Sequence, residues 1–289
     1  MTFYELGQTT LRAESYDKAI KQLVQYAYKM RQLVSVVPSS SWKNNFFREQ
    51  TSIPTNQPGN AIRGIPRGAD FPNAVLSWEK VTTYIEKYGL SGSIDHEDII
   101  AGEIDMRNRT ILRIAEGVAK AVDTQIAAVL TEGYSVSSIQ SYAINTEATG
   151  GWWNESSAAI LKNLAHLKSM VKTYYDNASN FVCVIHPDRE EDVLHYIYEK
   201  GAQATTAGQA AFNGQIGSPA GVSIITSSVI DVSHALFLVP QKCATWKQLM
   251  PLQTDTESKA FKGDKITACE YGVCELHEPK QVVLCKIVK

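Results

Sequence analysis

The side chains of this chain that could do chemistry are its histidines, cysteines and clustered acids. His186 follows the apolar run FVCVI (181–185) and precedes a helical stretch, the position where α/β enzymes often place reactive groups. Cys183 lies three residues earlier, so a thiol and an imidazole could form a nucleophile and its base. Residues three apart in a strand face opposite sides of the sheet, however, which favours a buried structural cysteine. An α/β enzyme built on 150–245 is the alternative that a pocket converging on His186 or Cys183 would support.

Four acids follow His186 closely, and paired carboxylates could act as general acid and base. They fall in the first turn of a predicted helix, where the helix dipole stabilises negative charge, and we interpret them as helix-starting residues: Asp188, Glu190, Glu191 and Asp192. The motifs GxSxG, HExxH, GxGxxG, and GxxxxGK followed by Ser or Thr, are absent from the sequence. No catalytic residue is therefore predicted.

The five cysteines include no CxxC pair and are odd in number, which indicates reduced, buried thiols. The nearest approach to a metal-binding pattern consists of Cys269, Cys274, His277 and Cys285. Positions 274 and 277 point to opposite faces of a strand, so a shared zinc ion would need a turn between them. We predict neither a metal nor a cofactor.

The composition is that of a chain with a large apolar core. The 289 residues are 44% hydrophobic and 20% charged, with a formal net charge of −2. The weak negative charge argues against a strongly basic face for nucleic acid. The sequence contains neither a membrane-spanning apolar run nor a signal core near residue 1. Residues 1–77 carry a net charge of +4 and the remainder −6. Contacts between oppositely charged parts of neighbouring copies would explain this difference, and a solvated surface without a partner explains it nearly as well.

The N-terminal third predicts a helix followed by an unusual excursion. Apolar residues at three- and four-residue spacing indicate a helix over 11–37. Residues 38–72 then hold half of the ten prolines and cannot form a continuous helix or a central strand. Apolar side chains spread along such an arm need a surface to bury against, and another copy of the chain could supply it. The alternating segment VLSWEKVTTYIEKYG (75–89) predicts a two-sided strand that forms a long hairpin with this arm.

The rest of the chain alternates helices and strands. A helix roughly 40 Å long is predicted over 105–131, and a close backbone approach is one reason for Gly117 inside it. A layered α/β domain is indicated by helices over 156–175 and 188–200 and by strands over 181–185, 221–228 and 235–240. The segment 201–221 predicts a flexible loop, and strands return from about 256 to 289.

The order of these parts resembles the major capsid proteins of tailed phages, whose fold was first seen in the Hong Kong phage. WKNNFFRE (42–49), GNAIRGIPR (59–67) and FPNAVLSWEKVTTYIEKYG (71–89) are similar to the family's extended loop. EIDMRNRTILRIAEGVAKAVD (103–123) is similar to its spine helix. GVSIITSS (221–228), ALFLVP (235–240) and FKGDKITACEYGVCELHEPKQVVL (261–284) are similar to its axial strands and peripheral sheet. The resemblance covers nearly the whole chain and lies in the order of parts.

The resemblance implies an α+β capsid fold with five parts. These are an N-terminal arm (1–37), an extended β-hairpin loop (38–92), a peripheral domain with the spine helix (93–149), an α/β axial domain (150–245) and returning strands of the peripheral domain (246–289). It implies a structural subunit, not an enzyme, that self-assembles into hexamers and pentamers of an icosahedral virion shell. The shell would enclose double-stranded DNA without sequence-specific binding and would assemble in the host cytoplasm, away from membranes. Portal and scaffolding or decoration proteins are further partners that the family allows.

Nine residues of the loop are predicted to contact a neighbouring subunit: Trp42, Phe46, Phe47, Arg48, Ile62, Arg63, Ile65, Arg67 and Phe71. Some relatives join a loop lysine to a neighbour's asparagine. That chemistry needs a buried carboxylate beside the lysine, and since none is identifiable, no cross-link is predicted. About 37 residues precede the loop, so a scaffolding segment is expected to be separate or already removed. An encapsulin-type compartment shell, with cargo bound near the helix over 11–37, is the alternative within the same fold.

Overall fold

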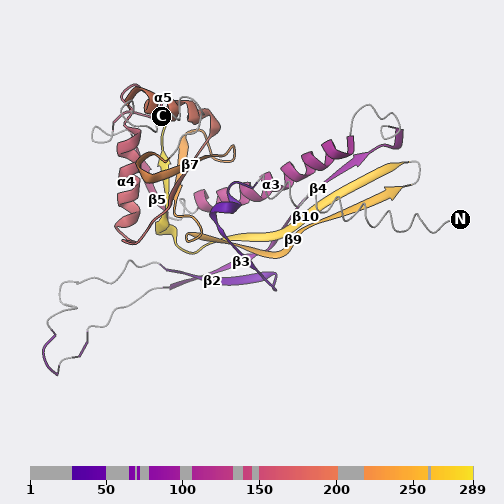
Figure 1. Cartoon of the computed structure of the whole chain (residues 1–289). Coiled ribbons are helices and arrows are strands. Elements are labelled where there is room, and N and C mark those ends of the chain that lie inside the picture. The colour runs from indigo at the N-terminus through magenta and orange to yellow at the C-terminus, as the bar shows by residue number, and fades with distance from the viewer. Residues whose placement is uncertain are drawn as a thin grey trace.

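The computed structural model describes residues 28–49, 65–68, 70–71, 78–97, 106–132, 139–144, 150–200, 218–259 and 262–288. Their strands form a long four-stranded sheet, a five-stranded sheet and a two-stranded hairpin. Figure 1 shows the long sheet as an extended limb, with the five-stranded sheet at one end of it. The α+β fold class predicted from the sequence is confirmed.

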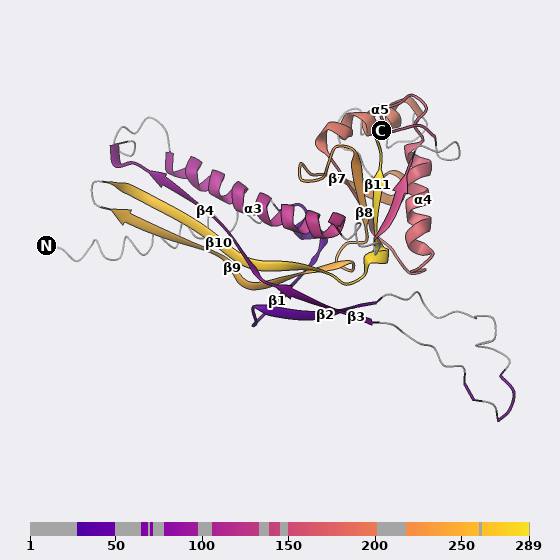
Figure 2. The same cartoon turned by 180° about the vertical axis from the view of Figure 1, so that it is seen from behind.

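The long sheet contains, in spatial order, β1 (Ser35–Pro38), β9 (Ala244–Lys259), β10 (Gly263–Leu276) and β4 (Glu86–Ile94). β10 pairs antiparallel with both β9 and β4, whereas β1 runs parallel to β9. The helix α3 (Met106–Glu132) lies along this sheet (Figures 1 and 2). Its buried side chains follow helical spacing, so one stripe faces the strands: Ile114, Val118, Val122, Ile126 and Leu130.

The five-stranded sheet contains β5 (Gln140–Ala143), β11 (Val282–Lys286), β8 (His234–Leu238), β6 (Phe181–Ile185) and β7 (Val222–Thr226) in that order. The helices α4 (Ile160–Lys172) and α5 (Glu190–Lys200) pack into the core on one face. The strand β6 shows how the two faces divide. Cys183 packs with α4 and α5, whereas Val182 and Val184 join the core around α3. FVCVI is therefore buried on both sides, as predicted.

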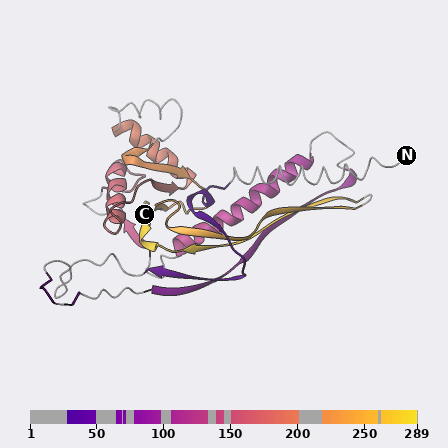
Figure 3. The same ribbon diagram turned by 60° about the horizontal axis from the view of Figure 1, so that its bottom comes forward.

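The hairpin consists of β2 (Lys43–Glu49) and β3 (Trp78–Tyr84), paired antiparallel with Phe46 opposite Val81. Figure 3 shows it beneath the long sheet. Only Ile85 separates β3 from β4, so the hairpin continues a strand of the long sheet. The predicted hairpin is confirmed within the described residues. The single strand predicted over 75–89 instead divides at Ile85 into two strands with different partners.

The helix predicted over 11–37 is wrong at its C-terminal end, and residues 1–27 lie outside the described part. Arg31–Leu33 form a single 3-10 turn (η1), and β1 then pairs with β9. Val36 and Val37 are β-branched and Pro38 cannot continue a helix, so strand pairing prevails over the apolar periodicity.

Two further predictions need correction. Strands over 246–289 were expected to return to the peripheral domain, but β11 pairs with β8 and β5 in the five-stranded sheet. A short apolar strand such as β11 could pair in either sheet, and its partners lie far away in the sequence. The sequence alone therefore does not show which sheet it joins. A Cβ on Gly117 would lie 2.6 Å from Leu90 Cδ2, so a side chain of β4, not a backbone, approaches the helix there. The predicted domain limits stay predictions.

The remaining elements follow the predicted order. α3 confirms the helix over 105–131, and α4 begins at Ile160 within the predicted 156–175. The 3-10 turn η2 (Pro187–Arg189) leads into α5, and β7 and β8 confirm the two apolar strands. Short turns η3 (Pro219–Gly221) and η4 (Pro279–Gln281) precede β7 and β11. The predicted loop over 201–221 lies mostly outside the described residues.

Gly272 gives a test of core packing in the long sheet. A Cβ at this position would overlap the indole ring of Trp246, which is fully buried and cannot move aside. We predict that Gly272→Ala lowers the free energy of unfolding by about 2–3 kcal/mol, measured by urea unfolding of dissociated subunits. Gly117→Ala is the control, because the exposed Leu90 can turn away and alanine favours a helix by about 1 kcal/mol. Equal losses in both variants would contradict this account of the packing.

Candidate contact surface on the β2–β3 hairpin

The thiol and imidazole considered for catalysis do not form a reactive pair. Cys183 is fully buried, and burial raises the pKa of its thiol to about 12. His186 caps the turn η2, where its Nδ1 accepts a hydrogen bond of 3.3 Å from the backbone N–H of Asp188. A neutral thiol inside the core and a histidine engaged at a helix start do not make a nucleophile and its base.

The other candidate groups are also structural. Of the predicted acids, Asp192 bonds Arg189 at 2.9 Å, and Glu190 and Glu191 stand in the first turn of α5. Cys274 and Cys285 belong to different core clusters, so the predicted cysteine pattern does not converge. Within the described part of the chain, no three His, Cys, Asp or Glu side chains gather closely enough to hold a metal ion. Among the helices in the described ranges, none is long and apolar enough to cross a membrane.

The inner face of the hairpin is bound to the end of β10. Phe46 is only 7% exposed, and its ring lies 4.9 Å from the imidazole of His277 in an edge-to-face arrangement. Beside it, Arg48 Nε donates a hydrogen bond of 3.2 Å to the carbonyl oxygen of Leu276. The hydroxyl of Thr83 donates a 2.9 Å hydrogen bond to Glu275. These contacts fix the position of the hairpin on its own subunit.

The outer face of the hairpin carries large aromatic side chains in solvent. Phe47 is 59% exposed, Trp78 56% and Tyr84 64%. Because side chains alternate along a strand, these residues stand opposite the inner face, together with Lys43 and Lys80. This outer aromatic face, Phe47, Trp78 and Tyr84, is the candidate contact surface.

The predicted contact residues divide between the two faces. Phe46 and Arg48 turn inward to their own subunit, whereas Phe47 turns outward. Trp42 is exposed on one side, although its ring meets that of Tyr271 edge-on at 5.4 Å. Elsewhere in the loop, Ile65 is half-buried and Arg67 and Phe71 are exposed, whereas Ile62 and Arg63 lie outside the described residues.

Trp78 and Tyr84 were not among the predicted contact residues. The signal that could have found them is the alternation in 75–89, which places both on one face of the strand. Antiparallel pairing with β2 then brings them to the face that also holds Phe47.

Two titratable groups lie beneath the hairpin at the end of β10. Burial raises the pKa of Glu275, while the hydrogen bond from Thr83 and the charge of Lys247 act in the opposite direction. Burial lowers the pKa of His277, and the positive charges of Lys247 and Arg48 lower it further. His277 Nε2 lies 3.8 Å from Glu275 Oε2. The surface on which the hairpin rests therefore disfavours charge on both groups.

A buried carboxylate orders the sheet that supports the hairpin. Glu270 on β10 is fully buried, and Arg31 Nη1 lies 2.9 and 3.2 Å from its two oxygens. The Tyr28 hydroxyl donates a hydrogen bond of 2.6 Å, and Gln248 and Trp246 donate from β9 at 2.8 and 3.3 Å. The sequence signal for this group is an acid on the otherwise apolar face of ITACEYGVC (266–274).

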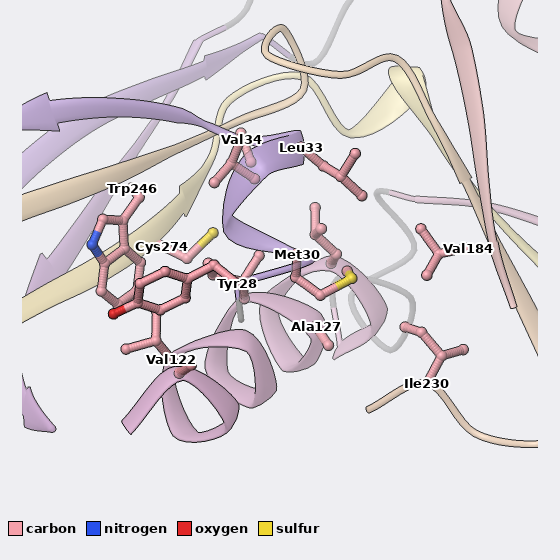
Figure 4. Packing of buried hydrophobic residues seen from close by; sticks show 14 of the residues in the cluster. Tyr28, Met30, Leu33, Val34, Val122, Ala127, Val184, Ile230, Trp246 and Cys274 are labelled. Carbon is pink, nitrogen blue, oxygen red and sulfur yellow. The ribbon is translucent and has the colours of Figure 1, made fainter. Parts of the chain in front are cut away.

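A second carboxylate fixes the same segment to the helix. Asp123 of α3 accepts hydrogen bonds from the backbone N–H groups of Lys29 and Arg31 at 2.7 and 3.1 Å. In Figure 4, Tyr28, Met30, Leu33 and Val34 stand among core residues of α3, the long sheet and the five-stranded sheet. Residues 28–34 therefore join the three layers.

Residues 78–273, more than half of the chain, match the family described as phage capsid protein. No curated protein sequence matches the chain.

Solved structures share the fold over most of the chain. The virus-like particle from Pyrococcus furiosus has a TM-score of 0.64 and 12% identity, over 93% of this chain and 97% of that one. The capsid of the cyanophage P-SCSP1u has a TM-score of 0.67 and 13% identity, over 90% and 88%. The mature capsid of bacteriophage PhiM1 has a TM-score of 0.59 and 14% identity, over 90% and 86%. At such identities the likeness establishes the fold alone.

The lowered pKa of His277 predicts a pH effect. As pH falls through the ordinary histidine pKa of about 6.5, the unfolded chain binds a proton that the folded chain resists, so stability is lost. We predict that the parent loses stability relative to His277→Gln between pH 7.5 and 5.5, measured by urea unfolding. His195→Gln, at an exposed position on α5, is the control and should follow the parent. A constant difference between the parent and His277→Gln across this range would disprove the prediction.

The Glu270 network predicts a large loss on substitution. Glu270→Gln leaves Arg31 without its counter-charge. It also places the NH₂ group of the new side chain against groups that themselves donate hydrogen bonds, so the free energy of unfolding should fall by about 3 kcal/mol. Glu116→Gln, which alters an exposed pair with Arg113, should change it by less than about 0.5 kcal/mol. Denaturant unfolding measures both, and a loss for Glu270→Gln as small as that of the control would show that the network is not stabilising.

Proposed function

The chain belongs to the phage capsid protein family, and on that premise we propose that its copies assemble through the outer face of the β2–β3 hairpin into hexamers and pentamers of an icosahedral shell around double-stranded DNA. Its role as a structural subunit of a capsid rests on the family and on a fold shared with solved capsids. Hexamers, pentamers, DNA and the hairpin contact are the parts that the proposal adds.

The outer aromatic face is the observation that carries the proposal. Three large aromatic side chains stand in solvent on one narrow ribbon, where an isolated subunit gains nothing from them. Burying one such side chain contributes about 1.5–3 kcal/mol before ordering costs are subtracted. The inner face already holds the hairpin to β10, so little further ordering is needed when a neighbour covers the outer face.

The remaining features fit a shell subunit. A contact between two different surfaces, repeated around closed symmetry axes, builds rings and then a shell. The small net charge of −2 allows many copies to pack closely and argues against a strongly basic face that grips nucleic acid. We infer a structural and not a catalytic role, assembly in the host cytoplasm, and portal and scaffolding or decoration proteins as the other partners.

A compartment shell is the second candidate. The similarity to a virus-like particle over 97% of that chain favours a closed shell without specifying its content. Electron microscopy and nuclease treatment of particles recovered from producer cells separate the two candidates. Nuclease-resistant double-stranded DNA inside the particles supports the viral shell, and particles filled with protein support the compartment.

Substitutions on the two faces of the hairpin test the contact. Phe47→Ser with Trp78→Ser should lower the yield of particles at least about ten-fold, because the contact with the neighbouring subunit loses two large apolar side chains. The urea midpoint of the subunit should not change, since both side chains are exposed. Light scattering and negative-stain microscopy measure assembly.

Two further variants serve as controls. Phe46→Ala should destabilise the subunit by about 3 kcal/mol, because this side chain is buried within its own subunit. Lys265→Ser, at an exposed position of β10 away from the hairpin, should change neither stability nor assembly. If the Phe47 and Trp78 double variant assembles as readily as the parent, the outer face is not the contact surface.

A further inference from the structure

The two helices over the five-stranded sheet carry opposite charge. α4 contains three lysines and no acid, whereas residues 187–200, which form η2 and α5, contain five acids against two basic residues. Both helices turn their apolar sides to the same core, so their charged sides face outward. Figures 1 and 2 show α4 along the outer side of this end of the molecule and α5 across its top.

The exposed charges have similar spacing on the two helices. Lys162 and Lys172 are exposed and lie ten residues, or roughly 15 Å, apart along α4. Glu191 and Glu199 are exposed and lie eight residues, or roughly 12 Å, apart along α5, and Glu199 Oε1 also lies 3.7 Å from His195 Nε2 on the same helix. The third lysine of α4, Lys168, is half-buried, and its Nζ donates a 2.8 Å hydrogen bond to the carbonyl oxygen of Ala220. Each helix therefore presents two like charges over a comparable length.

The outward side of α4 also carries apolar surface. Leu161 is exposed, and by helical spacing it shares this side with Ala165 and Lys172. A partner that covers the lysines would therefore also cover an apolar strip. Such a combination is typical of a subunit contact, in which charges set the register around a drier centre.

We propose that α4 of one copy faces α5 of the next copy around the symmetry axis, with Lys162 and Lys172 opposite Glu191 and Glu199. The inference rests on the proposed function, because it names a second contact within the same shell. A ring contact joins two different surfaces of identical chains, and these two surfaces complement each other in charge and length. Exposed ion pairs bind weakly, so the pairing sets register and association rate more than strength.

Charge reversal tests the pairing. The first variant is Lys162→Glu with Lys172→Glu, the second is Glu191→Lys with Glu199→Lys, and the third combines all four substitutions. At about 50 mM salt, each double variant should assemble at least about ten-fold more slowly than the parent by light scattering. The four-fold variant should assemble at the parent's rate, because opposite charges meet again. Lys120→Glu with Lys265→Glu changes the net charge as much as the first variant does, but on the limb, and should leave the rate unchanged.

A mixture of the two double variants gives a sharper test. One kind of copy is then acidic on both helices and the other basic on both, so the two can alternate around a six-membered ring. A five-membered ring always places two copies of one kind side by side. We expect an equimolar mixture to form rings or sheets of hexamers and few closed shells.

The outcomes separate this inference from the proposed function. Double variants that assemble at the parent's rate, or a four-fold variant that stays as slow as the double variants, would overturn the helix pairing while the shell function stands. A parent that forms no particles would overturn both. Normal particles from the Phe47 and Trp78 variant, combined with the expected charge-reversal results, would overturn the hairpin contact alone.

Discussion

The buried carboxylate of Glu270 is the interaction on which the rest of the molecule depends. A carboxylate removed from water is tolerated only when a counter-charge and hydrogen-bond donors surround it, and here they come from β9 and from residues 28–31. Asp123 ties the same short segment to α3. Helix, long sheet and entering chain are therefore held in one arrangement, and β10 becomes a fixed support for whatever rests on it.

On this support the two faces of the hairpin have different roles. The inner face attaches the hairpin to its own subunit, and the outer face is exposed. A two-stranded ribbon is marginally stable alone, so the inner face must bind the subunit if the hairpin is to keep a defined direction. Phe46, Arg48 and Thr83 provide that binding at the end of β10. The alternate residues make no contact that the fold needs, so large aromatic side chains can remain in solvent there, and the proposed subunit contact would cover them.

The periodicity of apolar residues predicted many of the helices and strands correctly. It did not predict which strands pair with each other. The apolar stripe of α3, the continuous run of β6 and the alternation of β3 each describe an element by itself, and all three are present. The alternation shows that the strand has two faces, but not which of them is buried. The inner face is the one that contacts Glu275 and His277, and these residues lie nearly 200 positions further along the chain. β1 and β11 were misplaced for the same reason, because their partners come from distant sequence.

The pairing of Phe46 with Val81 has a consequence for fidelity. Side chains alternate with a period of two, so a slip of β2 by one residue would exchange the roles of Phe46 and Phe47. The slipped subunit would lose its attachment beside His277 and would offer its neighbours the wrong pattern of rings at the same time. If the proposed contact forms, slipped copies would be excluded from the shell, and the strand register would select correctly folded subunits before they are incorporated.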